Sequence, residues 1–350
     1  MGRIAYGVTA LFTVAVIVTE LFLEEPPVLV LFGVASLALV GLAWVLGRAT
    51  ESVGHYAGPR VGGILNATFG NAAELRITIF ALAAGLTTVV KASIIGSVIG
   101  NVLLVLGASL LIGGLKNGTQ RFSTTIAGAN ASMLAIVAFA LAFPTVFYSL
   151  DPAEGNPSLE YLSISVAVVL IVLYALYLLF YLRRQEEAPG PGEEELPPFG
   201  KVASFVVLVG STAAVAYVSE AFVGAIEPLT EEVGLSELFI GVIVIPIVGN
   251  VAEHVVGVQI AYKNNIDFSM AISLGSSIQV ALLVTPILVF LGPLMGTPLD
   301  LVFTPLELVS LGAAVVVSAF IALDGESNWL EGAMLCGVYL IAALTFFFTP

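Results

Sequence analysis

One short motif occurs twice in the sequence, as Gly70-Asn71-Ala72-Ala73-Glu74 and as Gly249-Asn250-Val251-Ala252-Glu253. Each copy lies in an apolar run that is long enough to cross a bilayer. A charged side chain near the centre of the hydrocarbon costs about 2.5 to 3.5 kcal/mol on insertion scales, so a carboxylate at that depth needs a functional reason. Two matched carboxylates predict a site for a cation.

The composition is that of a polytopic membrane protein. Of the 350 residues, 59% are hydrophobic and 10% are charged, and the mean hydropathy is +1.06. A soluble domain is about half apolar and a quarter charged. The formal net charge is -14 without a basic tail or patch, which argues against nucleic acid as a partner. Cys336 is the only cysteine, so an intrachain disulfide is excluded.

Clusters of charge, glycine and proline divide the apolar runs into candidate membrane spans of about 20 residues or more. The sequence predicts an all-α polytopic protein in the lipid bilayer, with eleven transmembrane helices. The third span is rich in polar residues, and its match to the eighth supports it. The predicted spans are residues 4–23, 28–54, 61–86, 90–115, 123–149, 159–182, 201–224, 236–262, 267–292, 300–323 and 328–348.

The basic residues predict the orientation of these spans. With eleven spans, Lys91 is the only basic loop residue on one side of the membrane, and nine others lie on the opposite side. Loops enriched in Lys and Arg are usually cytoplasmic. The N-terminus is therefore expected in the cytoplasm and the C-terminus on the opposite side. The basic residues on the predicted cytoplasmic side are Arg3, Arg48, Arg60, Lys116, Arg121, Arg183, Arg184, Lys201 and Lys263.

A constant offset of 179 residues relates the two halves of the chain. It maps Glu74 onto Glu253, and it also maps Ser97 onto Ser276. The offset leaves the first helix unpaired and gives each half five spans. Because five is odd, the second half enters the membrane from the opposite side, as in inverted-repeat transporters. The predicted parts are an unpaired helix (1–24), a first five-helix repeat (25–183), an acidic cytoplasmic linker rich in proline and glycine (184–200) and a second five-helix repeat (201–350).

The two motifs carry the ligands of a hard cation. In each copy the Asn and the Glu are three residues apart, which places both on one face of a helix. A glycine precedes each Asn, and Pro246 lies upstream of the second copy, so the helix can loosen and turn main-chain carbonyls toward a cavity. Calcium takes six to eight oxygen ligands, whereas soft metals prefer Cys or several His. The predicted ligands are Glu74, Glu253, Asn71 and Asn250, with Gly70 and Gly249 beside them.

The spans that follow each motif add hydroxyl groups. Ser97 shares a helical stripe with Ser93 and Asn101, and Ser276 lies in a comparable polar patch of the ninth span. Small residues also let membrane helices approach closely. Both interpretations stay open, and the shared register favours Ser97 and Ser276 as site residues.

Proton coupling follows from the carboxylates. Two carboxylates that lie close together in a medium of low dielectric cannot easily both stay ionised, so a divalent cation or protons neutralise them. That competition is the minimum that antiport requires. His254 follows Glu253, whereas Leu75 holds the matching position in the first half. A histidine there either handles a proton near neutral pH or stays neutral in a hydrogen bond to a neighbouring helix.

Residues 62–75, together with residues 249–254, closely resemble the paired signature repeats of the calcium/proton exchanger family, within the cation/calcium exchanger superfamily. The resemblance implies eleven helices, of which the first is unpaired and the other ten form two inverted five-helix halves joined by an acidic linker. It also implies that Glu74 and Glu253 bind calcium and protons alternately, and that the second and seventh spans move to switch access. The linker of this chain is shorter and richer in proline than the extended acidic helix of the family.

The expected function is secondary antiport that exports calcium from the cytoplasm in exchange for protons, which makes both ions substrates and requires no cofactor. The membrane would be the cell membrane of a prokaryote or the vacuolar membrane of a eukaryote. A sodium-coupled exchanger is the nearest alternative, and the Gly-Asn-x-x-Glu form favours protons. A cation channel is more distant, because an inverted repeat favours alternating access. No enzyme activity is expected, since neither a His-Glu-x-x-His motif nor a Gly-x-Ser-x-Gly motif occurs.

Overall fold

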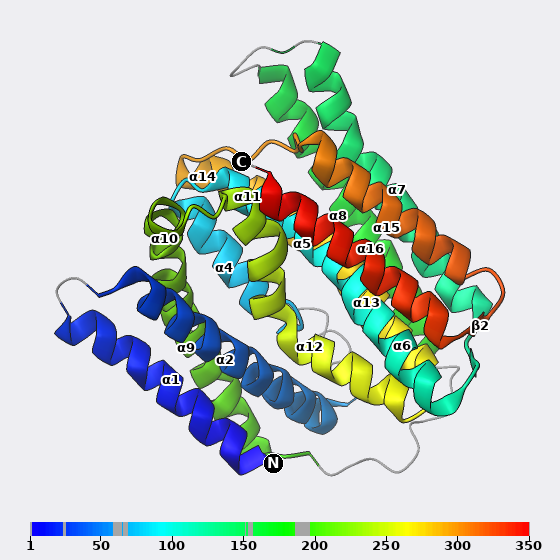
Figure 1. Ribbon diagram of the computed structural model, residues 1–350, viewed down its shortest axis with the longest axis horizontal. Helices are drawn as coiled ribbons and strands as arrows, with labels where there is room; N and C mark the ends of the chain where they lie inside the picture. The colour runs from blue at the N-terminus through cyan, green and yellow to red at the C-terminus, as the bar shows by residue number, and fades with distance from the viewer. Residues whose placement is uncertain are drawn as a thin grey trace. The chain divides into compact units, whose positions relative to one another are not determined.

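The computed structural model describes residues 2–23, 26–58, 65, 69–150, 152, 157–185 and 197–349. Most of the acidic linker, and residues 62–64 and 66–68 of the first signature, lie outside the described residues. The described chain consists of helices and their connections, with one pair of short strands (Figure 1).

The first half of the described chain contains the helices α1 (Gly2–Phe22), α2 (Val28–Ala57), α4 (Ala72–Ala83), α5 (Thr87–Ile99), η1 (Gly100–Val105), α6 (Leu106–Asn117), α7 (Thr124–Leu150) and α8 (Pro157–Gln185). The second half contains α9 (Lys201–Gly224), α10 (Ile226–Val233), α11 (Glu237–Phe239), η2 (Ile240–Val244), α12 (Ile245–Tyr262), α13 (Ile266–Gln279), η3 (Val280–Val284), α14 (Thr285–Met295), α15 (Pro305–Ile321) and α16 (Trp329–Phe348). The strands are β1 (Gln120–Arg121) and β2 (Glu326–Ser327).

The helices have the length and apolarity of membrane spans. Eight of them pass both criteria among the described residues, and the bent pair Glu237–Val251 and Glu253–Tyr262 makes nine if it counts as one span. The apolar helix α15 is shorter, with 17 residues. Each predicted range overlaps a described helix. The helical membrane architecture is therefore confirmed, and the number of crossings stays a prediction.

The chain divides into two compact units. Unit 1 contains Met1–Phe80, Val172–Gly234 and Val248–Ala252. In this unit α2 packs along both α1 and α9. Leu46, Ala49, Ala72 and Leu208 form a buried cluster where α2, α9 and the start of α4 meet.

Unit 2 contains Ala81–Ile171, Leu235–Ile247 and Glu253–Pro350. Its centre is the continuous helical segment α5–η1–α6, in which 83% of an apolar stretch of 18 residues is buried, the largest such share among the candidate spans of the described chain. The helices α11, α13, α15 and α16 and the π turns η2 and η3 pack against this segment. Ser97, which the sequence predicts for the site, therefore lies in the core of unit 2.

Three helices of unit 2 contain π turns, the segments η1, η2 and η3. Pro246 follows η2 and Pro286 follows η3, and a proline cannot donate the backbone hydrogen bond that an α-helix requires. Single π turns are frequent at functional sites. The π turn η2 lies just upstream of Pro246, and α12 is also bent by 67° between Val251 and Glu253, within the second motif.

The tenth predicted span was placed too early. We expected it at residue 300, but α15 begins at Pro305. Thr304 Oγ1 accepts a hydrogen bond from the Glu307 amide at 3.3 Å, and Glu307 Oε2 accepts one from the Thr304 amide at 2.7 Å. This reciprocal capping box sets the start of the helix, with Pro305 at a position where its missing N–H is not needed.

The strands β1 and β2 were not predicted. They pair antiparallel, with Gln120 opposite Ser327 and Arg121 opposite Glu326. Arg121 and Glu326 also form an ion pair of 3.0 Å. Two residues are too few for an alternating pattern, so the sequence carried no signal for either strand.

Gly96 and Gly275 are equivalent under the offset of 179 but differ in their surroundings. A Cβ atom at Gly96 would overlap the carbonyl of Val242 on η2, whereas a Cβ atom at Gly275 would meet no heavy atom within 4 Å. Gly96 therefore permits α5 and η2 to approach closely, which is the usual use of small residues between membrane helices.

We expect Gly96→Ala to lower the free energy of unfolding by about 2 kcal/mol, because overpacking forces backbone shifts. Gly275→Ala is the matched control, and its stability should stay unchanged or rise slightly, since alanine is the better helix former. Thermal unfolding of the purified protein in detergent measures both changes. Equal losses in the two variants would contradict the asymmetry.

Candidate functional site

The carboxylate of the first motif and the amide of the second motif meet in unit 1. Glu74 is fully buried in the first turn of α4, and Asn250 on α12 is 1% exposed. Asn250 Nδ2 donates a hydrogen bond to Glu74 Oε2 over 3.0 Å. A Cβ atom at Gly249 would lie 3.3 Å from the Cβ of Glu74, so the second glycine permits this approach.

The two copies of the motif differ locally. In the first copy, Gly70 and Asn71 form a turn and α4 begins at Ala72, so the expectation that one helix carries both Asn71 and Glu74 is wrong. The Asn71 carbonyl accepts the first helical hydrogen bond, from Leu75 N at 2.9 Å. Glu74 consequently lies near the positive end of the α4 dipole, which stabilises a negative charge.

The second copy lies on α12, which is bent by 67° between Val251 and Glu253. Asn250 precedes this bend and Glu253 follows it, so the prediction that they share one helix face stays a prediction. Glu253 and His254 belong to unit 2 and are both half-buried. The Nε2 atom of His254 finds no hydrogen-bond partner within the described part of the chain.

The predicted serines lie in the core of unit 2. Ser97 on α5 is fully buried, and Ser276 on α13 is 4% exposed. Asn101 Nδ2 donates a hydrogen bond to Ser276 Oγ over 3.0 Å. Asn101 shares the stripe of Ser97 and is 1% exposed, so its place in this polar cluster follows from the four-residue spacing.

A further contact joins positions that the repeat equates. Ser277 Oγ donates to the Val98 carbonyl at 3.4 Å, and the two residues are 179 positions apart. Helices α5 and α13 therefore meet at equivalent points of the two halves. We did not predict Ser277 as a site residue, although the offset between it and Val98 was available from the sequence.

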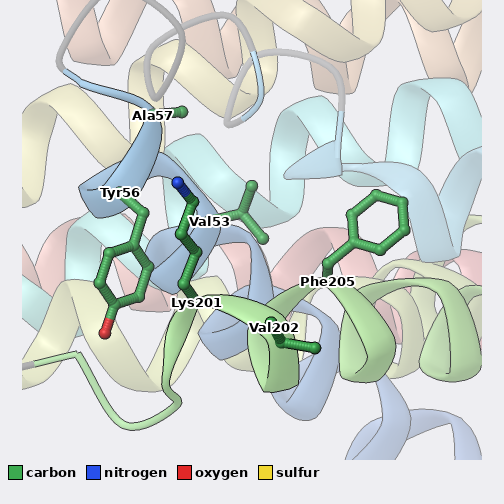
Figure 2. Close-up of a pocket in the computed structure, with 6 residues that line it drawn as sticks. All are labelled: Val53, Tyr56, Ala57, Lys201, Val202 and Phe205. Atoms are coloured by element: carbon green, nitrogen blue, oxygen red, sulfur yellow. The ribbon is translucent and has the colours of Figure 1, made fainter.

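The cavity drawn in Figure 2 does not contain the predicted site residues. It has a volume of about 530 Å³ and lies between the end of α2 and the start of α9 in unit 1. Its walls are mostly apolar, with Lys201 as the charged group. The lining residues are Val53, Tyr56, Ala57, Lys201, Val202 and Phe205.

The side-chain oxygens that could bind a cation are carboxylate, amide and hydroxyl oxygens, and such oxygens occur in both units. Among the described residues no group of three or more His, Cys, Asp and Glu side chains could hold a metal ion. In unit 1 these oxygens include those of the Glu74–Asn250 pair, and in unit 2 they include that of Ser276, to which Asn101 donates a hydrogen bond. Such oxygen donors are the ligands of calcium and of other hard cations.

Comparison with known proteins agrees with the two signatures. Residues 27–183 and 203–348 match the family described as sodium/calcium exchanger protein. The Ca²⁺/H⁺ antiporter of Aphanothece halophytica is 41% identical over 337 residues, which cover 91% of this chain and 90% of that protein. The Ca²⁺/H⁺ antiporter ChaA of Bacillus subtilis is 45% identical over 331 residues, with 92% and 93% covered.

A solved structure shares the fold over nearly the whole chain. The structure of native YfkE has a TM-score of 0.86 and 40% sequence identity, and the match covers 99% of this chain and 100% of that one. The signature motifs, the family match and the relatives all agree. This chain therefore belongs to the sodium/calcium exchanger protein family, within the calcium/cation antiporters that its paired motifs predicted.

Proposed function

We propose that this protein exports calcium ions from the cytoplasm in exchange for protons, by alternating access. The observation that carries the proposal is the buried carboxylate of Glu74, bonded to Asn250 of the second motif. The two relatives compared above are named Ca²⁺/H⁺ antiporters, and each match covers at least nine-tenths of both chains. This supports proton coupling and does not favour the sodium-coupled alternative. We propose calcium and protons as substrates, without a cofactor or an enzymatic reaction.

The exchange is a competition for carboxylates. An ionised Glu74 in the membrane is costly, and either a divalent cation or a proton removes the cost. The Asn250 amide is a hydrogen-bond donor, so it can serve the oxygen that it contacts whether the carboxyl group is charged or neutral. The carboxyl group can therefore change its occupant without losing this support.

We propose the remaining ligands from the motif and the repeat. Glu253 acts with Glu74 as the second exchange carboxylate in one site near the membrane midplane, and His254 takes part in proton coupling. The proposed supporting oxygens come from Asn71 and Asn250, from the main chain at Gly70 and Gly249, and from the hydroxyl groups of Ser97 and Ser276. The buried serines of unit 2 and the short approach at Gly249 support this set.

The proposed architecture has eleven membrane helices. Residues 1–24 form the unpaired helix, residues 25–183 and 201–350 form the inverted repeats, and residues 184–200 form a cytoplasmic linker. The Ser277–Val98 hydrogen bond between repeat-related positions supports the repeat. The charge distribution supports a cytoplasmic N-terminus in a cell membrane or a vacuolar membrane.

Glu74→Gln and Glu253→Gln should each reduce calcium flux at least about 100-fold, equivalent to about 3 kcal/mol of binding free energy, because a neutral amide cannot exchange calcium for a proton. Reconstituted liposomes with a calcium indicator inside measure the flux. The control is Glu227→Gln, since Glu227 is exposed on α10 and should not matter. Near-normal flux in both motif variants would refute the site.

An imposed proton gradient should drive calcium uptake into these liposomes without sodium. The physical reason is that protons alone can neutralise the carboxylates that calcium vacates. The measurement compares a pH gradient with a sodium gradient of equal size. Uptake with the sodium gradient only would make sodium the coupling ion, and a current with no coupled proton movement would indicate a channel.

His254→Leu reproduces the first half, where Leu75 holds the matching position. If His254 exchanges a proton near neutral pH, the pH profile of calcium flux should shift by about half a unit or more. Flux measured from pH 5.5 to 8.5 tests this. A profile equal to that of the unsubstituted protein would make His254 a structural residue.

A further inference from the structure

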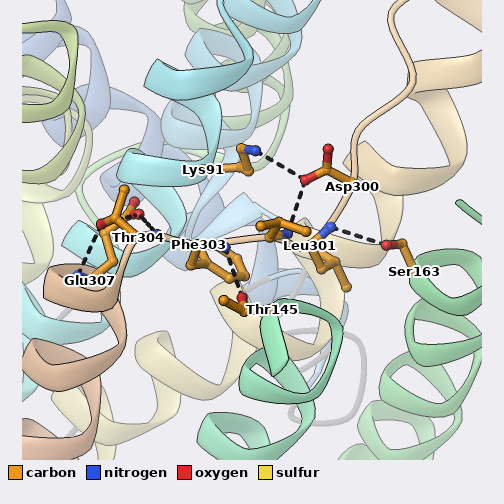
Figure 3. Close-up of polar contacts among 9 residues, drawn as sticks. Lys91, Thr145, Ser163, Asp300, Leu301, Phe303, Thr304 and Glu307 are labelled. Carbon is orange, nitrogen blue, oxygen red and sulfur yellow. Dashed lines mark hydrogen bonds and ion pairs between the residues drawn. The ribbon is translucent and has the colours of Figure 1, made fainter. Parts of the chain in front are cut away.

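A non-helical segment of unit 2, Gly296–Thr304, is held by polar contacts to four other parts of that unit. Figure 3 shows the contacts made by Asp300, Leu301 and Phe303. Lys91 Nζ on α5 forms an ion pair with Asp300 Oδ1 at 3.0 Å. The other contacts are Thr297 Oγ1 to the Leu82 carbonyl at 2.9 Å, Leu301 N to Ser163 Oγ at 3.1 Å and Phe303 N to Thr145 Oγ1 at 2.9 Å. These bonds fix the segment at the end of the unit where α5 and α15 begin.

Glu307, just beyond this segment, is a buried carboxyl group with one unsatisfied oxygen. Its residue is 2% exposed. Glu307 Oε2 accepts hydrogen bonds from the Thr304 amide at 2.7 Å and from Thr304 Oγ1 at 2.8 Å. Glu307 Oε1 is buried and finds no hydrogen-bond partner among the described residues. The capping box therefore accounts for one oxygen and leaves the other unexplained.

The lysine on the helices that pack against α15 already forms an ion pair. Helix α15 packs against α5, η1, α7 and α16. Lys91 is the basic residue of these described elements, its charge acts on Glu307, and its ammonium group binds Asp300. The other titratable groups on these elements are Tyr148 on α7 and Glu331, Cys336 and Tyr339 on α16.

An ionised Glu307 would be a buried charge with an unbonded oxygen, which is unfavourable in an apolar environment. A proton removes that charge. Loss of the proton would create a second anion for Lys91, and attraction is stronger for a buried anion than for Asp300, whose side chain is 41% exposed. The protonation state of Glu307 thus bears directly on the Lys91–Asp300 pair.

We propose that Glu307 is a proton-binding site of the exchanger, separate from the two motifs, and that its proton controls the partner of Lys91. With the proton bound, Lys91 stays with Asp300 and the segment Gly296–Thr304 stays fixed. Without it, Lys91 turns to Glu307 and releases Asp300. Since α15 packs against α5 and η1, which carry Ser97 and Asn101, the pH at this end of unit 2 acts on the helices of the serine cluster. The coupling to transport rests on the proposed exchange with protons.

The decisive variant is Glu307→Gln, because glutamine at this helix position also forms a capping box while it cannot titrate. Glu331→Gln is the matched control: Glu331 occupies the same position in the Asn328–Glu331 capping box of α16, but it is only half-buried. We expect Glu307→Gln to shift the pH of half-maximal calcium flux by about half a unit or more, a threefold change in apparent proton affinity. The pH profile of calcium flux for Glu331→Gln should match that of the unsubstituted protein. Equal profiles for Glu307→Gln and the unsubstituted protein, or equal shifts in both variants, would overturn the proposal.

A second measurement uses the unsubstituted protein and does not depend on folding of a variant. Dicyclohexylcarbodiimide, an apolar reagent for protonated carboxyl groups, is applied across a pH series and the modified peptides are identified by mass spectrometry. Modification of Glu307 that falls as the pH rises supports the site, and its absence or independence of pH overturns it. If the unsubstituted protein shows no proton-driven calcium uptake, the proposed exchange fails, whereas the labelling still decides whether Glu307 binds a proton.

Discussion

The structure depends on one constraint, that a carboxylate inside a membrane must have a partner or an occupant. Glu74 meets it with the first turn of α4, whose dipole favours negative charge, and with the Asn250 amide at 3.0 Å. The two motifs therefore have to meet in space, and Gly249 permits it because a larger residue would crowd the Glu74 Cβ. Either a proton or a cation would satisfy the same constraint, which is why we propose Glu74 as an exchange carboxylate.

Unit 2 is organised differently, around a densely packed core that the segment α5–η1–α6 forms with its neighbours. Gly96 lets the Val242 carbonyl approach α5, and the π turns before Pro246 and Pro286 accommodate the missing proline donors. Within this core Asn101 Nδ2 donates to Ser276 Oγ, while Asn101 Oδ1 and the hydroxyl groups of Ser93 and Ser109 find no hydrogen-bond partner among the described residues. Buried polar pairs of this kind hold oxygen donors in place and bind neighbouring helices together.

Glu307 shows how a second buried carboxyl group can be only partly supported. Its capping box satisfies one oxygen, and the neighbouring Lys91 is bound to Asp300. A helix cap alone does not require burial of the whole side chain, because Glu331 caps α16 while half-buried. The difference between these two otherwise similar glutamates points to chemistry beyond capping.

The sequence by itself determined the membrane class and the family, and it singled out Glu74 and Asn250, because the cost of burying a charge and the offset of 179 residues can both be read from the order of the residues. It did not reveal the start of α4 at Ala72, the start of α15 at Pro305 or the strand pair, since these depend on caps and distant partners. Only the tertiary structure decided that Asn250 bonds to Glu74, and that Gly96 is confined while its equivalent Gly275 is not. A repeated sequence specifies equivalent local preferences, whereas the contacts of each copy depend on neighbours that the repeat does not duplicate.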